Sequence, residues 1–335
     1  MKRRALVCSL AALGCAPARP RLNVFNWSSY VAPETVSDFA AEFGVRVRYS
    51  VYESNEEMLA RVFSGNSGWD VVFPTHYIVP PMVEQGLLDP LDHARLPTLK
   101  NLDPAGARPG RLTHAVPYMW NATGILFNRK LQHRPTAWAD LWDARFAGKI
   151  TMLDDPAEVL AAALRKLGYS LNASDPAQLR AAQREALRQQ PLLRASRTSE
   201  VRDQVVAGDV LAAQLWSTTA QQAIDAAPGL DFVYPREGFP VNLDCAVILR
   251  ESPRQALAHE WINYLLRPEV SARVADSMRT ATANLAAKRI LPPATRDNPT
   301  LYPPPDVMAR GEWFATLSSS AQRLRDRLWT EIKSG

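Results

Sequence analysis

The chain has 335 residues, of which 47% are hydrophobic and 22% charged, a composition typical of globular proteins and a length sufficient for two separate cores. Its formal net charge of +5 falls to +2 without Lys2, Arg3 and Arg4, because the 39 basic residues then become 36 against 34 acidic ones. This near-neutral balance, with no basic stripe between aromatic residues, argues against a nucleic-acid partner.

The N-terminus has the pattern of a bacterial export signal. Its basic residues precede an apolar stretch at residues 5–13, which is shorter than the about 20 residues that span a bilayer. Gly14 and Cys15 then match the position at which bacterial lipoproteins are cut and lipidated, although Leu13 is larger than the usual residue there. We expect residues 1–21 to be a signal peptide and lipoprotein linker, and the protein to be periplasmic with a membrane link only through Cys15. The alternative is cleavage a few residues later, which would release a soluble protein.

Strand and helix signals alternate along the rest of the chain. Short apolar or alternating runs predict strands at residues 24–25, 46–52, 69–74, 124–128, 149–155, 209–216 and 245–250. Ser54, Asp155 and Asp175 stand at N-cap positions, with an acidic or amide residue three places later, and predict helix starts. An amphipathic helix is expected over residues 254–267. This alternation is typical of parallel-rich sheets covered by helices, so the predicted fold class is α/β.

The sequence contains little that points to an enzyme. It lacks a His-Glu-x-x-His motif, a glycine-rich phosphate loop and a Gly-x-Ser-x-Gly elbow. The five histidines are scattered singly, without the spacing of metal ligands. We therefore expect no catalytic residue, no metal site and no cofactor.

Aromatic and acidic residues occur instead where the expected strands end or a connection bends. They are Trp27, Tyr30, Tyr77, Trp216, Asp155, Glu158 and Asp244. In parallel-rich sheets the ligand crevice lies beyond the carboxyl ends of the strands, so these side chains can converge on one cleft. Aromatic faces attract an ammonium group by about 0.5–2 kcal/mol, and carboxylates provide the acceptors that a buried ammonium group needs. The set therefore fits an alkyl ammonium ligand.

Each of these residues also has a structural interpretation that the sequence leaves open. Asp155 and Glu158 have the spacing of a capping box, which stabilises a helix start without any ligand. Trp27 and Trp216 are large enough to belong to the core. Asp244 precedes an apolar run and is either a strand-end acid paired locally or a ligand contact.

A set of segments in a fixed order carries a resemblance to a known family. The segments are NWSSYVAPE, YESNEEM, DVVFPTHYIV, VPYMWNATGILFN, TAWADLW, LDDPAEVLAAALRKLGYS, LWSTTA, WINYLLRPEV, NLAAKRIL and GEW. Over residues 22–333 the chain resembles the periplasmic spermidine/putrescine-binding proteins of bacterial polyamine ABC importers. The resemblance implies a two-lobed periplasmic-binding-protein fold of type II, with mixed sheets flanked by helices and the ligand cleft between the lobes. It also implies a first lobe of residues 22–121 and 245–288, and a second lobe of residues 122–244 and 289–335.

The resemblance further implies a set of polyamine contacts. They are Trp27, Tyr30 and Tyr77 from the first lobe, Asp155, Glu158 and Trp216 from the second, Asp244 from a hinge strand, and Ser28 and Thr198 as supporting hydroxyl groups. Asn242 and Thr280 occupy positions of the same site. The ring and acid residues among these contacts are the ones that the strand ends indicate independently.

Four positions depart from the family pattern. The spermidine binders carry an acid at the position of Ser29, a tryptophan at Asn242, a tyrosine at Thr280 and a glutamine at Phe314. The three acids Asp155, Glu158 and Asp244 are retained, and three acids are enough to pair two ammonium groups. We therefore expect a putrescine-like diamine, or a differently shaped amine, in preference to spermidine.

The function implied by the resemblance is transport. The protein would capture a polyamine and deliver it to an inner-membrane ABC permease, acting as a monomer and performing no chemistry. Two alternatives keep the same fold, since a fold does not determine a function: binding of another small cationic or amino compound, or signalling to a membrane partner as a polyamine sensor.

Overall fold

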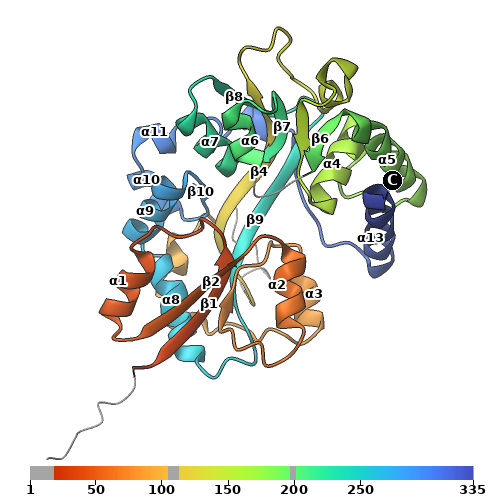
Figure 1. Cartoon of the computed structure of the whole chain (residues 1–335). Coiled ribbons are helices and arrows are strands. Elements are labelled where there is room, and N and C mark those ends of the chain that lie inside the picture. The colour runs from red at the N-terminus through yellow and green to blue at the C-terminus, as the bar shows by residue number, and fades with distance from the viewer. Residues whose placement is uncertain (1–18, 105–112, 197–200, 335) are drawn as a thin grey trace, which may run out of the picture.

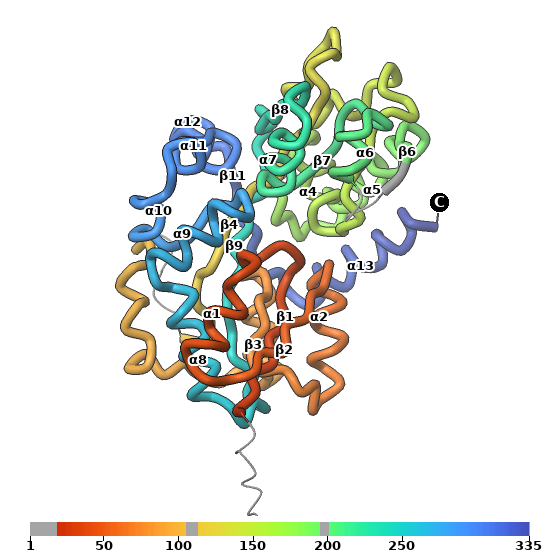
Figure 2. Tube along the Cα trace, turned by 60° about the vertical axis from the view of Figure 1, so that its left-hand side comes forward, coloured from red at the N-terminus to blue at the C-terminus, as the bar shows by residue number. Residues whose placement is uncertain are grey.

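The computed structural model describes residues 19–104, 113–196 and 201–334 of the chain. It shows an α/β protein of two lobes joined by two long strands (Figure 1). A view turned by 60° shows the same division, with the red and orange N-terminal elements in one lobe and the green middle of the chain in the other (Figure 2). Cys15 and Thr198 lie outside the described residues, so the expectations for them stay predictions.

The first lobe is formed by the N-terminal elements together with two helices from later in the chain. Its elements are β1 (Arg21–Trp27), α1 (Thr35–Glu42), β2 (Arg46–Tyr52), α2 (Asn55–Val62), β3 (Val71–Val72), α3 (Val79–Glu84), the 3-10 helices η1 (His93–Arg95) and η2 (Pro97–Asn101), α8 (Gln255–Leu265) and α9 (Pro268–Met278). β1 pairs in parallel with both β2 and β3. Phe39 of α1 packs edge-on against Trp261 of α8, with 4.9 Å between ring centroids. Large buried rings of this kind give the lobe its own core.

The second lobe is formed by the middle of the chain and by the C-terminal helix. Its elements are the 3-10 helices η3 (Trp138–Trp142) and η4 (Ala144–Phe146), β5 (Ile150–Met152), α4 (Pro156–Lys166), α5 (Pro176–Gln189), η5 (Gln190–Leu192), β6 (Leu193–Ser196), α6 (Val201–Ala207), β7 (Ala212–Trp216), α7 (Ser217–Ala226), β8 (Leu230–Val233) and α13 (Ser319–Ser334). β5 pairs in parallel with β6 and β7. As predicted, α4 starts after an Asp155 N-cap. It ends before Gly168, whose φ of +78° is readily adopted only by glycine.

Two long antiparallel strands connect the lobes. β4 (Val116–Asn128) pairs with β9 (Phe239–Ile248) through its first half and with β7 and β8 through its second half. β9 in turn pairs with β3 in the first lobe. One continuous sheet therefore runs through both lobes, in the order β2-β1-β3-β9-β4-β7-β5-β6.

The chain passes between the lobes once more near its C-terminus. β10 (Ala281–Thr282) pairs with β4, and α10 (Leu285–Ile290) packs against α9. After α11 (Pro293–Arg296) and α12 (Pro305–Met308), β11 (Gly311–Trp313) pairs with the part of β9 that lies in the second lobe. The last helix, α13, then packs against α5.

The expected strands at residues 124–128 and 245–250 overlap only part of β4 and β9. The other halves are not predicted from the sequence because prolines and side-chain amides interrupt the apolar pattern there. Pro117 and Asn121 interrupt it in β4, and Pro240 and Asn242 in β9. Within these unpredicted halves, residues 119–122 of β4 pair with residues 241–244 of β9.

Two of the three predicted lobe limits, at residues 121/122 and 244/245, fall inside the two long strands, and the third, at 288/289, falls inside α10. Met119 and Leu243 belong to the core of the first lobe. Ala122 and Val241 belong to the core of the second lobe. Along each long strand, the residues therefore pass from the core of one lobe to the core of the other within a few positions of the predicted limit. The limits themselves stay a prediction.

Candidate functional site

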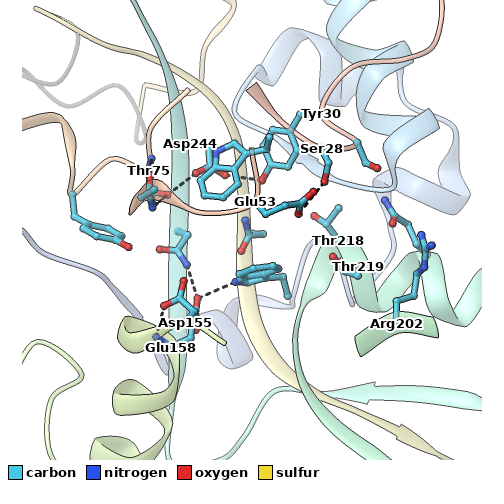
Figure 3. Close-up of a pocket in the computed structure, with 18 residues that line it drawn as sticks. Ser28, Tyr30, Glu53, Thr75, Asp155, Glu158, Arg202, Thr218, Thr219 and Asp244 are labelled. Atoms are coloured by element: carbon cyan, nitrogen blue, oxygen red, sulfur yellow. Dashed lines mark hydrogen bonds between the residues drawn. The ribbon is translucent and has the colours of Figure 1, made fainter. Parts of the chain in front are cut away.

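A cavity with a volume of about 210 Å³ lies between the lobes, beside the middle of β4 and β9 (Figure 3). Three parts of the fold line it. The first lobe contributes Trp27, Ser28, Ser29, Tyr30, Glu53, Asn55, Thr75 and Tyr77, the long strands contribute Asn121, Asn242 and Asp244, and the second lobe contributes Asp155, Glu158, Arg202, Trp216, Thr218, Thr219 and Gln222. The polar and aromatic lining is therefore assembled from segments far apart in the sequence.

The lining residues meet because parallel strands of both lobes end at this cavity. Trp27 is the last residue of β1, and Glu53 directly follows β2, which runs parallel to it. In the second lobe, Asp155 follows β5, and Trp216 is the last residue of the parallel strand β7. The carboxyl ends of parallel strands share one edge of a sheet, so each lobe presents such an edge to the cavity.

Nine of the residues predicted for the site line this cavity. They are Trp27, Ser28, Tyr30, Tyr77, Asp155, Glu158, Trp216, Asn242 and Asp244. Thr280 is not among the lining residues. It is buried, and its hydroxyl accepts a hydrogen bond of 3.0 Å from Thr218, which does line the cavity. Thr198 lies outside the described residues.

Asp244 is held in place by two hydroxyl groups. The Tyr30 hydroxyl donates to Oδ2 at 2.7 Å, and the Thr75 hydroxyl donates to Oδ1 at 2.9 Å. Burial raises the pKa of Asp244 to about 6, although the two hydrogen bonds favour the carboxylate. The sequence left open whether Asp244 is paired locally or contacts a ligand. Its local partners are neutral hydroxyl groups, which orient the carboxylate but do not compensate its charge.

Glu158 is 2% exposed and is saturated on one oxygen only. Its Oε1 accepts hydrogen bonds from Thr123 Oγ1 at 3.0 Å, Trp216 Nε1 at 3.1 Å and Asn242 Nδ2 at 2.9 Å. Its Oε2 is buried and has no hydrogen-bond donor among the described residues. Burial, and next the nearby charge of Asp155, raise the pKa of Glu158 to about 8.

The capping-box interpretation is right for Asp155 and wrong for Glu158. Asp155 Oδ1 accepts a hydrogen bond of 3.0 Å from the backbone N–H of Glu158, as an N-cap does. The Glu158 side chain does not return this bond but points toward Thr123 and Trp216. Burial, followed by the charge of Glu56, raises the pKa of Asp155 to about 6.

Two amide oxygens of the long strands also lack donors. Asn121 and Asn242 are direct cross-strand partners on β4 and β9, so their side chains share one face of the sheet. Within the described part of the chain, nothing donates to the buried Oδ1 atom of either residue. Buried acceptors of this kind cost free energy until a ligand or water donates to them.

The charge balance of the site favours a cation. Asp155, Glu158 and Asp244 all have raised pKa values, and in the described ranges no lysine or arginine is among the causes acting on them. Three acids without a basic partner among these causes, together with three unpaired oxygen acceptors, match a positively charged ligand with several N–H donors.

Aromatic rings form the walls around these acceptors. Trp27 is oriented by a hydrogen bond of 2.7 Å from its Nε1 to the Phe73 carbonyl, and its ring lies 6.3 Å from that of Tyr30. Tyr77 lies 5.4 Å from the ring of Phe314, which is itself buried. Phe314 does not line the cavity itself, so a substitution there would affect a bound ligand by moving the ring of Tyr77.

Two charged lining residues were missed by sequence reasoning, Glu53 and Arg202. Glu53 stands at a strand end, like Trp27, and the same rule would have identified it. Arg202 lies in the seven-residue helix α6, which was not predicted from the sequence. Its place in the cavity depends on the tertiary structure alone.

The described residues carry neither a metal site nor a membrane span. Across the three described ranges, no group of three or more His, Cys, Asp or Glu side chains is arranged to hold a metal ion. No helix in the same ranges combines the length and the apolar character needed to cross a bilayer.

Comparison with known proteins identifies the family of the chain. A family model described as bacterial extracellular solute-binding protein matches residues 34–303. The chain belongs to this family. Its members are transport proteins that bind solutes, and they are not enzymes.

Three similar proteins show which solute-binding proteins this chain resembles. The spermidine/putrescine-binding periplasmic protein of Escherichia coli (strain K12) is 33% identical, over 99% of this chain and 98% of that protein. The putrescine-binding periplasmic protein SpuD of Pseudomonas aeruginosa (strain UCBPP-PA14) is 32% identical, over 98% of this chain and 96% of that protein. The crystal structure of the lipoprotein TpPotD of Treponema pallidum has a TM-score of 0.83 at 25% identity, with 93% and 99% of the two chains covered. The resemblance found in the sequence is thereby confirmed.

Proposed function

We propose that this solute-binding protein captures a polyamine between its lobes and delivers it to an ABC permease of the inner membrane. The observation that carries the proposal is the buried Glu158 carboxylate, whose Oε2 has no donor among the described residues. Such a carboxylate is satisfied when a cation with N–H donors binds it. The names of the relatives support the same ligand class.

The proposed ligand lies along the cavity with its charges and methylene groups separated. Its ammonium groups pair with Asp155, Glu158 and Asp244, and the amide oxygens of Asn121 and Asn242 accept further N–H groups. The methylene groups lie against the rings of Trp27, Tyr30, Tyr77 and Trp216. Ser28 and Thr198 supply additional hydroxyl groups. The long strands act as the hinge about which the lobes close on the ligand.

We further propose that the ligand is a diamine such as putrescine in preference to spermidine. SpuD, at 32% identity, is named for putrescine. The replacement of the family tryptophan by Asn242 supports a change of ligand, because Asn242 donates to Glu158 at 2.9 Å and no longer offers an aromatic wall. Ser29 removes a family acid, but Glu53 brings a carboxylate to the neighbouring Ser28, whose hydroxyl donates to it at 3.4 Å.

The proposed place of action is the periplasm. Export follows from the signal pattern at residues 1–21, and lipidation of Cys15 would hold the protein at a membrane surface. The similar protein TpPotD is named as a lipoprotein. We also propose that the protein acts as a monomer.

A ligand panel tests this function. Thermal unfolding of the purified protein should shift upward with putrescine, cadaverine, spermidine or agmatine, because a ligand that binds only the native state stabilises it. Calorimetry then ranks the amines that act, and putrescine should bind more tightly than spermidine. A panel in which neutral or acidic amino acids shift the midpoint and no amine does would overturn the proposal.

A further inference from the structure

One basic side chain lines the cavity within the described parts of the chain. It is Arg202, the second residue of α6 in the second lobe. Figure 3 shows it on the side of Thr218 and Thr219, away from Asp155 and Glu158. The cavity is therefore asymmetric in charge along its length, with the buried carboxylates toward one end and a guanidinium at the other.

The charge of Arg202 is only slightly compensated by its ion pair with Asp203. Its Nε donates to Oδ1 of the neighbouring Asp203 at 2.9 Å. The two side chains are 42% and 68% exposed, and exposed pairs of this kind interact weakly. A guanidinium has five N–H donors, so Arg202 also keeps donors that can act within the cavity.

The first lobe places a single acid at this end. Glu53 lines the cavity, and its Oε2 accepts a long hydrogen bond of 3.4 Å from Ser28 Oγ. Figure 3 shows Glu53 and Ser28 nearer to Thr218 and Thr219 than Asp155 and Glu158 are. This end therefore combines one acid, one base and hydroxyl groups, whereas the other end holds three acids without a base.

We infer, resting on the proposed function, that Arg202 is a specificity-determining residue that excludes a third ammonium group from this end of the cavity. A diamine satisfies the acids at the far end and leaves the Arg202 end to water and hydroxyl groups. A triamine that extends along the cavity brings an ammonium group toward the guanidinium, and the two like charges repel each other, less strongly at this 42% exposed side chain than at a buried one. Discrimination between ligands often depends on such a repulsive element.

Isothermal calorimetry with putrescine and spermidine tests this role. The wild-type protein is compared with Arg202→Gln, which removes the charge, and with Arg202→Lys, which keeps it. Arg202→Gln should raise the affinity for spermidine relative to putrescine by about tenfold, equivalent to about 1.4 kcal/mol, while Arg202→Lys should keep the wild-type ratio. Glu53→Gln should change the ratio in the opposite direction, because it removes the only acid at this end in the described lining.

A matched control separates a local effect from a change in net charge. Arg194 of β6 is in the same lobe, is 50% exposed, pairs with Asp209 at 3.8 Å and does not line the cavity. Arg194→Gln should leave the spermidine-to-putrescine ratio unchanged, and thermal unfolding should show that every variant is folded.

The outcomes distinguish this inference from the proposed function. If the wild type binds putrescine but Arg202→Gln keeps the wild-type ratio, or Arg194→Gln changes it equally, the role of Arg202 is wrong and the function stands. If the wild type binds neither amine, the proposed function is wrong, and the inference falls with it.

Discussion

Glu158 is the side chain whose hydrogen bonding points most directly to a ligand. Three donors converge on its Oε1, while its buried Oε2 has none in the described structure. Burial raises its pKa to about 8, so the ligand-free protein holds a proton there at neutral pH. The site is thus neutral at this position without a cation and becomes charged when a cation arrives.

Replacing Glu158 by Gln should separate binding from stability. The variant keeps the shape and an acceptor at Oε1 but cannot become negative. Truncating one partner of a buried charge pair costs about 2–5 kcal/mol, so polyamine affinity measured by calorimetry should fall by that amount. The ligand-free variant should be more stable than the wild type at pH 8.5, because no buried charge remains at this position.

A neighbouring acid provides the control for this substitution. Asp154 is exposed and pairs with Lys333 at 2.8 Å on the surface. Asp154→Asn should leave the affinity nearly unchanged. A Glu158→Gln protein that binds as tightly as the wild type would refute the central role of this carboxylate.

Asp244 gives a second prediction at the residue scale. Asp244→Asn keeps a side-chain acceptor for Tyr30 or Thr75 but removes the charge. Calorimetry should show a loss of about 2–5 kcal/mol in polyamine binding. Unchanged affinity would mean that this acid serves only to link the two hydroxyl groups.

Binding should also depend on pH through Glu158. Below about pH 8 the ligand-free carboxyl group carries a proton that must leave before the ammonium group binds. The ligand amines stay protonated, since their ordinary pKa is about 10. Affinity should therefore rise from pH 6 to pH 8, by at most about tenfold per pH unit for one proton. Calorimetry in two buffers of different ionisation enthalpy should detect proton release at pH 7 in the wild type, and less of it in Glu158→Gln.

At the scale of elements, the start of α4 performs two tasks at once. Asp155 caps the helix through its bond to the Glu158 N–H and also lines the cavity. The same local pattern occurs at Asp175, which caps α5 through a bond of 2.8 Å to the Ala177 N–H and does not line the cavity. The two helix starts therefore differ in ligand contact while sharing a cap.

This pair of caps allows a controlled experiment. Asp155→Ala should lower the free energy of unfolding by about 0.5–2 kcal/mol, the usual value of an N-cap, and should also weaken polyamine binding. Asp155→Asn should keep most of the stability and still weaken binding, because the amide oxygen caps but carries no charge. Asp175→Ala should lose stability alone. Chemical denaturation and calorimetry report the two quantities, and equal binding losses in both alanine variants would contradict a role for Asp155 in the site.

At the scale of the whole molecule, the site makes stability depend on pH and ligand. The pKa values of Asp155, Glu158 and Asp244 are all raised in the folded protein, to about 6, 8 and 6. A folded state that holds protons more tightly than the unfolded chain loses stability as the pH rises through that window. The contribution of these groups is thus fully present below about pH 4 and is lost as the pH rises through about 6 for the two aspartates and about 8 for Glu158.

The unfolding midpoint should record this linkage. Without ligand, the contribution of the site should lower the midpoint between pH 5.5 and pH 8.5, by roughly 2–4 °C for each kcal/mol lost. Saturating putrescine should flatten this fall, because the ammonium groups compensate the carboxylates. The shift caused by putrescine should therefore be larger at pH 8.5 than at pH 5.5, and the reverse order would contradict the assignment of these acids to the site.

Local patterns were sufficient for the elements whose signals lie close together in the sequence. The N-caps at Ser54, Asp155 and Asp175 predicted the starts of α2, α4 and α5 correctly, because a cap is a contact between residues two or three places apart. The strand at residues 46–52 was also predicted with its observed limits. The predicted export signal and the family resemblance likewise depend on contiguous residues.

The sequence by itself determined the α/β class, the family and nine of the eighteen residues that line the cavity. Tertiary structure alone decided how those side chains are used, because pairing between distant segments has no local signal. It extended β4 and β9 across both lobes, turned Glu158 from its helix cap toward Trp216, and brought Glu53 and Arg202 into the lining. Burial by the folded chain then raised the pKa values of the three acids, a property that no residue has in isolation.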